Sequence, residues 1–477
     1  MYSVLFLGII SFLLALALTP LVRNCFRRWG VVDHPDGDRK HHERPVPRVG
    51  GIPLIIAYVC SLGLLSLTPL SAGKLVADAM PFALRFLPAI LLIFTTGLLD
   101  DLVGLKPWQK LAGQLAAAGA AYWAGVQVQA FGGHAFAAWW SLPLTLLWLV
   151  LCTNALNLID GMDGLATGVG LFAAFTMLLA GMLQENFALA VATVPLVGCL
   201  LGFLRYNFSP ASIFLGDSGS LFLGFLLGCY GILWSEKSAT ILGMTAPLMA
   251  LAIPLLDTAL AILRRFLRHQ SIFAADRGHI HHRLLDRGLT PRKVVLIFYG
   301  LCSLAAIFSL TLASHHFEAV VILLFCAAAW FGIHYLGYVE LGVVGRMFLE
   351  GTFRRMLSAR INLHQYQERL AAAVTPQDCW TVIESAAREF GFERAHMKFG
   401  GYAFEYRLDP AASCAWSLSI PLSECDYVEL SAPVAAASSN GVVAHFASML
   451  HRDLSARLAS LEAQSAASPQ NGSPRSH

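Results

Sequence analysis

The feature that most constrains the fold of this sequence is a series of apolar segments, each about as long as a membrane-crossing helix. A helix rises 1.5 Å per residue, so roughly 20 mostly apolar residues cross the bilayer core. The chain is 56% hydrophobic and only 13% charged, whereas soluble domains average about 25% charged residues. About eleven segments qualify by length and composition: 2–22, 49–69, 82–99, 109–128, 139–156, 165–183, 187–204, 215–234, 241–262, 293–313 and 317–338.

The first apolar segment and the cysteines indicate little beyond a membrane-embedded chain. Segment 2–22 has no basic region before it and no small-residue cleavage site, so we expect a retained helix rather than a signal peptide. The 10 cysteines show no CxxC pair. We expect inert packing for most of them, with neither a disulfide framework nor a zinc site.

The distribution of Lys and Arg predicts how the chain is oriented in the membrane. The loops after the first, third, fifth, seventh and ninth segments share one side of the membrane and together with the C-terminal segment hold most of the Lys and Arg, whereas the opposite side has little beyond Lys74, Arg85 and Lys237. An excess of these residues in short loops marks the cytoplasmic side. We therefore predict that these loops and the C-terminal segment are cytoplasmic and that the N-terminus is outside. All the polar motifs described below lie on this predicted cytoplasmic side.

The composition changes after about residue 340. Segments 354–372 and 376–390 have amphipathic helical patterns, and a closing helix is expected at 441–463. Short strands are expected between these helices, at 393–399, 402–408, 415–421 and 426–431. The predicted fold is an all-α polytopic membrane protein with a small α+β C-terminal cytoplasmic domain. Its predicted parts are a transmembrane domain (1–340), an α+β domain whose element order resembles a GAF-type sensory domain (341–462), and a disordered tail (463–477).

The first loop, residues 33–51, has the sequence DHPDGDRKHHERPVPRVGG. Its prolines and glycines rule out a regular helix. Its density of Arg, Lys and His suits an anionic ligand such as a phosphate. The alternative is a topology signal that binds anionic lipid head groups.

Two adjacent acids, Asp100 and Asp101, close the third apolar segment. Carboxylates at a membrane boundary are costly unless they are solvated or paired. Such a pair can hold a divalent cation through oxygen ligands or act as a base. The alternative is an interfacial cap that faces water.

A polar stripe follows at the end of the fifth segment, in NALNLIDGMDGLATG. Asn154, Asn157 and Asp160 are spaced by three, so on a helix end they share one face. The glycines that follow allow the backbone to turn and bring Asp163 to the rim. A polar stripe of this kind normally lines a cavity in a membrane protein.

The loop between the seventh and eighth segments has the sequence RYNFSPASIFLGDSGS. Asp217 lies between glycines where the next helix is expected to begin. A helix N-terminus favours phosphate, and a carboxylate there can bring Mg²⁺ to bridge it. Phe214 could stack on a planar base, although an aromatic residue at an interface is more often a membrane anchor.

The ninth segment contains Asp257, and the loop after it includes the sequence DRGHIHHRLLDR. His279, His281 and His282 suggest zinc at first sight. A zinc site usually needs a further ligand at a suitable spacing, and the neighbouring arginines repel a dication. A loop that binds pyrophosphate fits the residues better.

Taken in order, the motifs DHPDGDRKHHERPVPRVGG, GLLDDLVGL, NALNLIDGMDGLATG, FLGDSGS and HIHHRL resemble those of the polyprenyl-phosphate N-acetylhexosamine-1-phosphate transferases. The resemblance covers about residues 1–340. It implies transfer of N-acetylhexosamine-1-phosphate from a UDP-sugar to undecaprenyl phosphate, with release of UMP. It also implies Mg²⁺ (or Mn²⁺) as cofactor, a bacterial inner membrane location, a cytoplasmic active site and no nucleic-acid partner. A homodimer is compatible with it.

The same resemblance implies residue roles by motif match. Asp217 would be the principal metal ligand, with Asp160 as a second. Asp100 and Asp101 would handle the lipid phosphate, so the implied catalytic residues are Asp100, Asp101 and Asp217. The implied substrate-binding residues are Lys40, Asn157, Asp160, Asp163, Asn207, Phe214, Arg277, His279, His281, His282 and Arg283.

The resemblance also favours one branch of the superfamily. The basic first loop and the interrupted HIHH pattern look closer to the teichoic acid and O-antigen initiators, which favours GlcNAc-1-phosphate. The pentapeptide transferase has a Thr-Pro-Thr-Met-Gly-Gly loop and a continuous His run. Two other classes stay open: a lipid-linked-sugar transporter, which would place polar residues near the bilayer midplane, and a membrane-tethered sensor built on the C-terminal domain.

Overall fold

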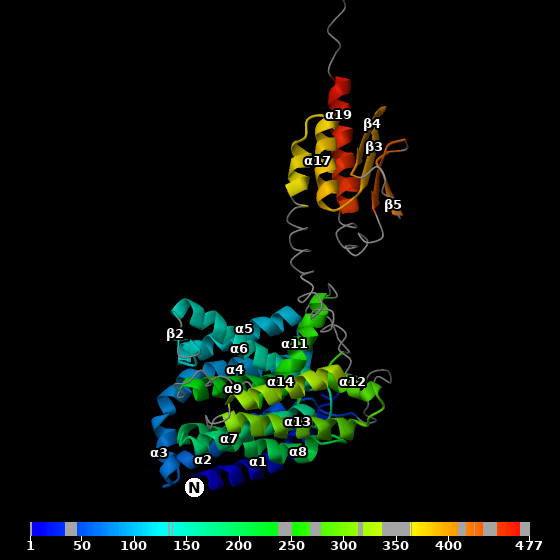
Figure 1. Cartoon of the computed structure of the whole chain (residues 1–477). Helices are drawn as coiled ribbons and strands as arrows, with labels where there is room; N and C mark the ends of the chain where they lie inside the picture. Colours follow the sequence, from blue (N-terminus) through cyan, green and yellow to red (C-terminus); the bar gives the residue numbers. More distant parts are fainter. Residues whose placement is uncertain are drawn as a thin grey trace, which may run out of the picture. The chain divides into compact units, whose positions relative to one another are not determined.

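The structure is a computed structural model that divides into two compact units, Met1–Tyr338 and Val339–His477 (Figure 1). The residues that the structure describes are 2–33, 45–131, 134–135, 137–236, 250–267, 278–312, 318–335, 363, 365–408, 416–423, 425–432 and 446–467.

The first unit is almost entirely helical. Every apolar segment predicted from the sequence contains a described helix, and two short helices, α3 and α12, were not predicted. The helices are α1 (Tyr2–Arg28), α2 (Gly51–Ser66), α3 (Ser71–Asp78), α4 (Met80–Val103), α5 (Pro107–Ala124), α6 (Ala138–Ile159), α7 (Leu165–Leu183), α8 (Phe187–Asn207), α9 (Gly216–Glu236), α11 (Ala252–Leu267), α12 (Ile280–Asp286), α13 (Pro291–Leu312) and α14 (Glu318–Tyr335). A short hairpin of β1 (Ala130–Phe131) and β2 (His134–Ala135) precedes α6.

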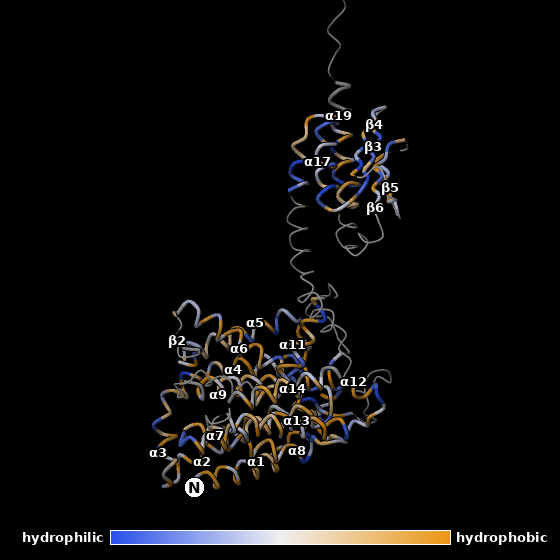
Figure 2. The backbone as a smooth tube through the Cα atoms, in the orientation of Figure 1, coloured by the Kyte–Doolittle hydropathy of each residue, from blue (hydrophilic) through white to orange (hydrophobic). Residues whose placement is uncertain are grey.

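Seven of the described helices are long and apolar enough to cross a membrane: α1, α4, α6, α7, α8, α9 and α13. Figure 2 shows the hydrophobic colouring that runs along the helices of this unit. The chain is thus a multi-pass membrane protein. The other helices in predicted segments, α2, α5, α11 and α14, are not among the seven, so the count of about eleven spans stays a prediction.

Helix α9 lies at the centre of this unit. The most apolar window of α9 is 89% buried inside the structure, whereas that of α1 is 22% buried. Helices α4, α6, α7 and α2 pack around α9. The polar residues at the start of α9 are therefore held by neighbouring helices.

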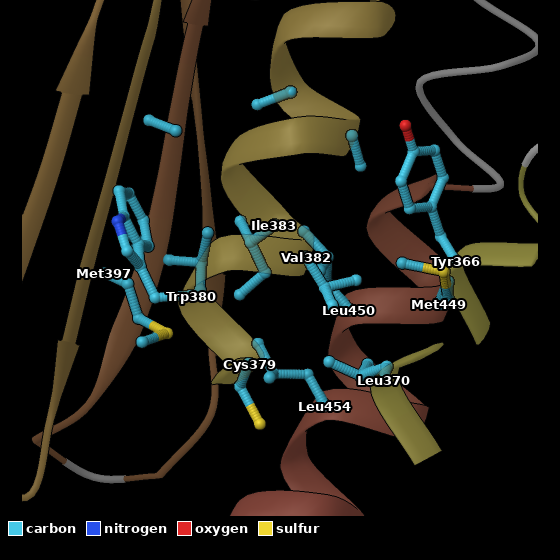
Figure 3. Close-up of a cluster of buried hydrophobic side chains, with 14 of the residues drawn as sticks. Tyr366, Leu370, Cys379, Trp380, Val382, Ile383, Met397, Met449, Leu450 and Leu454 are labelled. Carbon is cyan, nitrogen blue, oxygen red and sulfur yellow. The ribbon is translucent and has the colours of Figure 1, made fainter. Parts of the chain in front are cut away.

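The second unit is a small α+β fold. Its antiparallel sheet has the order β4-β3-β6-β5, formed by β3 (Arg394–Phe399), β4 (Tyr402–Arg407), β5 (Trp416–Pro421) and β6 (Tyr427–Ala432). Helix α17 (Pro376–Glu389), the π-helical turn η2 (Leu450–Leu454) and α19 (Ser455–Ala467) complete it. Figure 3 shows Trp380 of α17 beside Met397 of the sheet, while Val382 meets Leu450 on the other side of α17.

The four strands and α17 begin and end within one residue of the predicted positions. The predicted start of the disordered tail at residue 463 is wrong, because α19 continues to Ala467. Alanine and leucine have high helix propensity, and Leu461 is anchored in the core of this unit. Residues 354–362, 441–445 and 468–477, also covered by the predictions, lie outside the described residues. The GAF-type resemblance stays a prediction.

Candidate functional site

The first turn of α9 is held by a carboxylate from another helix. The first N–H groups of a helix have no partner within it. Asp101 at the end of α4 accepts hydrogen bonds from the backbone N–H of Asp217 (2.7 Å) and of Ser218 (2.9 Å). The negative charge of Asp101 also interacts favourably with the positive end of the helix dipole. Asp101 therefore fixes where Asp217 lies.

Gly216, immediately before Asp217, makes this close approach possible. Its φ is +71°, a conformation that side chains rarely adopt. A Cβ atom at this position would lie 2.7 Å and 2.8 Å from the two carboxylate oxygens of Asp101. Only glycine fits between the α4 carboxylate and the start of α9.

Lys110 in the first turn of α5 joins two acids and one amide from three helices. Its ammonium group donates to Asp100 Oδ2 (3.0 Å), to Asn157 Oδ1 (3.0 Å) and to Asp217 Oδ2. The other oxygen of Asp100 accepts the backbone N–H of Leu105 at 2.6 Å. One positive charge thus holds two carboxylates together in a part-buried site, where like charges alone would repel.

The polar stripe at the end of α6 faces the interior of the helix bundle, as its spacing of three predicted. Asn157 Nδ2 donates to Asp217 Oδ1 (3.0 Å) and to Ser220 Oγ (2.9 Å). One turn earlier, the side-chain amides of Asn154 and Gln114 exchange hydrogen bonds of 2.7 Å and 3.2 Å. The amides therefore orient Asp217 and tie α6 to α5 and α9.

Asp160 and Asp163 lie in the turn between α6 and α7. Asp160 is half-buried. Burial raises its pKa well above the usual range, and the negative charge of Asp217 adds to this while Arg48 opposes it. Asp163 Oδ2 accepts the backbone N–H of Ala211 at 2.9 Å, which links this turn to the loop before α9.

The loop before α9 is fixed from both sides. Asn207 is only 2% exposed; its amide oxygen accepts from Thr167 Oγ1 (2.6 Å) and its amide nitrogen donates to the carbonyl of Ile213 (3.0 Å). The backbone of Phe214 donates to Pro47 O (2.9 Å) and accepts from Gly50 N (3.0 Å). Asn207 therefore supports the loop in this structure. The roles of Asn207 and Phe214 in nucleoside binding stay predictions.

The HIHH segment was predicted as a loop, and this prediction is wrong, because residues 280–286 form helix α12. The helix begins where Asp257 of α11 accepts the backbone N–H of Ile280 at 2.9 Å. Asp257 also bonds His279 Nδ1 at 2.9 Å. The sequence separation of 23 residues hides this cap from local pattern analysis.

Helix α12 lies against the turn that carries Asp160. A Cβ atom on Gly161 would be 3.2 Å from His281 Nε2. Burial, with smaller effects from the neighbouring histidines, lowers the pKa of His281 to about 3. His281 is therefore neutral at physiological pH and can offer a ligand a hydrogen bond but no charge.

The remaining predicted site residues divide into two groups. The ring of His282 lies 4.3 Å from that of His281, and Arg283 Nε donates to the carbonyl of Gly278 at 3.2 Å, so both belong to the α12 region. Lys40 and Arg277 lie outside the described residues.

Sequence analysis missed several residues that the structure brings into the site. They are Lys110, Gln114, Ser220, Asp257 and Arg48. The spacing of Lys110 and Gln114 could have predicted their place in the site. Two polar residues four apart at the start of an apolar helix share a face and normally line a cavity.

The donor set around Lys110 can be compared with what a divalent cation requires. In the described part of the chain, no three His, Cys, Asp or Glu side chains are placed to hold a metal ion. Mg²⁺, however, is usually bound through one or two carboxylates together with substrate phosphates and water. Asp100 and Asp217 already share one cation, the Lys110 ammonium, and Asn157 adds an amide oxygen. These oxygen ligands fit Mg²⁺.

A multi-pass helical bundle with carboxylates, amides and a lysine gathered at the start of its central helix defines a class of membrane-embedded enzymes. Comparison with known proteins gives the family. Residues 83–235 match Glycosyl transferase family 4. The chain belongs to this family, within the polyprenyl-phosphate N-acetylhexosamine-1-phosphate transferase superfamily that its motifs predicted.

Several curated relatives are similar to the chain. A probable undecaprenyl-phosphate N-acetylglucosaminyl 1-phosphate transferase of Bacillus subtilis is 35% identical over 311 residues, which cover 64% of this chain and 84% of the relative. A decaprenyl-phosphate N-acetylglucosaminephosphotransferase of Mycobacterium tuberculosis is 34% identical over 61% of this chain and 78% of the relative's length. A phospho-N-acetylmuramoyl-pentapeptide-transferase of Moorella thermoacetica is 32% identical over 64% of this chain and 96% of the relative's length.

Proposed function

We propose that this protein transfers N-acetylglucosamine-1-phosphate from UDP-N-acetylglucosamine to undecaprenyl phosphate and releases UMP. The names of the Bacillus and Mycobacterium relatives support the transferred group and a polyprenyl phosphate acceptor. The product would begin a cell-surface polysaccharide such as an O-antigen. The reaction would take place at the cytoplasmic face of a bacterial inner membrane, where the excess of Lys and Arg is expected.

The observation that carries this proposal is the contact of Lys110 with both Asp100 and Asp217. Phosphoryl transfer depends mainly on positioning and on neutralising charge. A lysine that can exchange carboxylate oxygens for phosphate oxygens is suited to this task, and it lies at a helix N-terminus, which favours anions.

We propose Mg²⁺ as the cofactor. Asp217 is its principal ligand by motif match, Asp160 is the second predicted ligand, and the contact of Asp100 with the shared cation makes Asp100 a further candidate. Bound Mg²⁺ would supply charge neutralisation and polarise a phosphoryl oxygen.

In the proposed reaction, an oxygen of the polyprenyl phosphate attacks the β-phosphorus of the UDP-sugar. The new O–P bond forms as the bond from that phosphorus to the bridging oxygen breaks, and the electron pair leaves with UMP. No bond to the sugar carbon breaks, so the anomeric configuration is retained. Trapping a sugar-phosphorylated enzyme in the absence of lipid would instead favour a two-step route.

The hydrogen bonds of the two adjacent acids, Asp100 and Asp101, indicate different roles for them. Both oxygens of Asp101 accept backbone N–H groups, so Asp101 is better suited to hold Asp217 than to act as a base. One oxygen of Asp100 accepts a backbone N–H and the other accepts from Lys110. The ammonium group of Lys110 can exchange this carboxylate partner for a phosphate oxygen. We therefore assign the handling of the lipid phosphate to Asp100 and Lys110.

A pentapeptide-type transferase is the second candidate, because relatives of that name also match the chain. The two are separated by incubating purified protein with undecaprenyl phosphate, Mg²⁺ and a panel of UDP-GlcNAc, UDP-GalNAc and UDP-MurNAc-pentapeptide. Mass spectrometry of the lipid fraction should show the mass of GlcNAc-phosphate added to the lipid. A product only with the pentapeptide donor would replace our assignment, and no product with any donor would reject it.

A further inference from the structure

Asp257 lies on α11, outside the group of residues that meet at Lys110, and it is 1% exposed. Both of its carboxylate oxygens form hydrogen bonds at the start of α12. Oδ1 accepts the backbone N–H of Ile280 and Oδ2 lies 2.9 Å from His279 Nδ1. A buried carboxylate is costly unless it is fully hydrogen-bonded, so these two bonds account for its presence.

The two bonds determine which nitrogen of His279 carries the proton. A carboxylate oxygen can only accept, so Nδ1 must be the donor whether the ring is neutral or protonated. If the ring is neutral, Nε2 is then unprotonated. No described residue hydrogen-bonds Nε2, so this nitrogen is the one left to meet a ligand.

The same bonds fix α12 as a unit. They lie at its first residues, and the ring of His279 is stacked on that of His281 with centroids 5.7 Å apart and an interplanar angle of 9°. His281 in turn lies against Gly161. Movement of the Asp257 anchor would therefore shift the histidines relative to the turn that carries Asp160.

We propose that Asp257 is a positioning residue for the transfer reaction: it holds the proton of His279 on Nδ1 and anchors α12, so that His279 presents Nε2 to the substrate. This proposal rests on the proposed function for its effect on rate. Its effect on the histidine ring can be measured without substrate.

Asp257→Asn is the most informative variant. The backbone N–H of Ile280 is a fixed donor, so the single amide oxygen of Asn must accept it. The amide nitrogen then faces His279 Nδ1 and can only donate to it. The neutral ring is thereby driven into the opposite tautomer, with its proton on Nε2, while the size of the side chain is almost unchanged.

The tautomer can be read from ¹⁵N chemical shifts of the full-length protein with ¹⁵N-labelled histidine, with the His279 signals identified by their loss in His279→Gln. We expect a protonated Nδ1 in the wild type and an unprotonated Nδ1 in Asp257→Asn. An unprotonated Nδ1 in the wild type would overturn the proposal even if the variant fails to fold.

The rate of GlcNAc-1-phosphate transfer gives the second readout. In metal sites, loss of a carboxylate that orients a histidine costs about 10- to 100-fold. By comparison with these sites, we expect Asp257→Asn to reduce the rate by about 10- to 100-fold. Thr258→Val, at the adjacent and equally buried position, is the control and should change neither the ¹⁵N shifts nor the rate. An altered tautomer with an unchanged rate would overturn the positioning role. Absence of transfer in the wild type would count against the proposed function and leave the tautomer result intact.

Discussion

The carboxylate of Asp101 accepts the backbone N–H of Asp217 at 2.7 Å, although the two residues are 116 positions apart in the chain. The unpaired N–H groups of a helix start thus bring the two acids together. The arrangement sets the position of Asp217.

Asp101→Asn should therefore reduce transfer through the position of Asp217. An amide has one acceptor oxygen, so either the N–H of Asp217 or that of Ser218 loses its partner. An unsatisfied buried N–H costs about 1–3 kcal/mol, which thermal unfolding should detect together with a lower transfer rate. Asp78→Asn, at an exposed acid on α3, is the control. Wild-type stability in Asp101→Asn would show that the cap contributes little.

Gly216→Ala should be more harmful than Gly104→Ala. Both glycines have positive φ, +71° and +69°, a conformation in which alanine is strained. A Cβ at Gly104 has nothing within 4 Å, whereas at Gly216 it meets the Asp101 carboxylate. Transfer rates and unfolding temperatures of the two variants should separate steric overlap from backbone strain. Equal losses would argue against the close packing described here.

Lys110→Met should abolish most of the activity, because it removes the positive charge between Asp100 and Asp217. Loss of one electrostatic contact to a transition state typically costs about 10²–10³-fold in rate. The control is Lys74→Met, at an exposed lysine predicted to lie on the opposite side of the membrane. Activity within a few-fold of wild type in Lys110→Met would exclude Lys110 from the reaction.

His281 should make the protein less stable in acid. Its pKa is lowered from 6.5 to about 3 by burial, so between these values the unfolded chain binds a proton that the folded chain does not. Stability then falls as the pH drops below 6.5, at up to about 1.4 kcal/mol per pH unit, and is unaffected by this group above it. Thermal unfolding at pH 7 and pH 5 should show a smaller acid loss in His281→Gln. An equal loss in both proteins would contradict a buried, neutral His281.

Much of the fold and part of the site follow from local sequence patterns. Apolar length predicts the membrane helices, and the four short segments expected as strands in the second unit are strands. The spacing of Asn154 and Asn157 predicts their shared face, and the glycine before Asp217 predicts the helix start there. Each of these signals lies within a few residues of the feature that it predicts.

The missed features depend on contacts between distant segments. Lys110 appears in the sequence as one more basic residue at a membrane interface, and the packing of α5 against α4 and α6 brings it to Asp217. Asp257 appears as a lone acid in an apolar helix, and the carboxylate that begins α12 lies 23 residues upstream. The spacing of Lys110 and Gln114 predicts a shared polar face, but the distant partners of such hydrogen bonds have no local signature.

The most direct test of the proposed centre is the release of UMP by purified wild type and Asp217→Asn, with UDP-GlcNAc and undecaprenyl phosphate, over a series of Mg²⁺ concentrations. The wild type should release UMP only when Mg²⁺ is present. The rate of UMP release by Asp217→Asn should be lower by roughly 100-fold or more, the loss expected for a group that acts on the transition-state charge. Mg²⁺-dependent release at the wild-type rate in Asp217→Asn would contradict a catalytic centre at the start of α9.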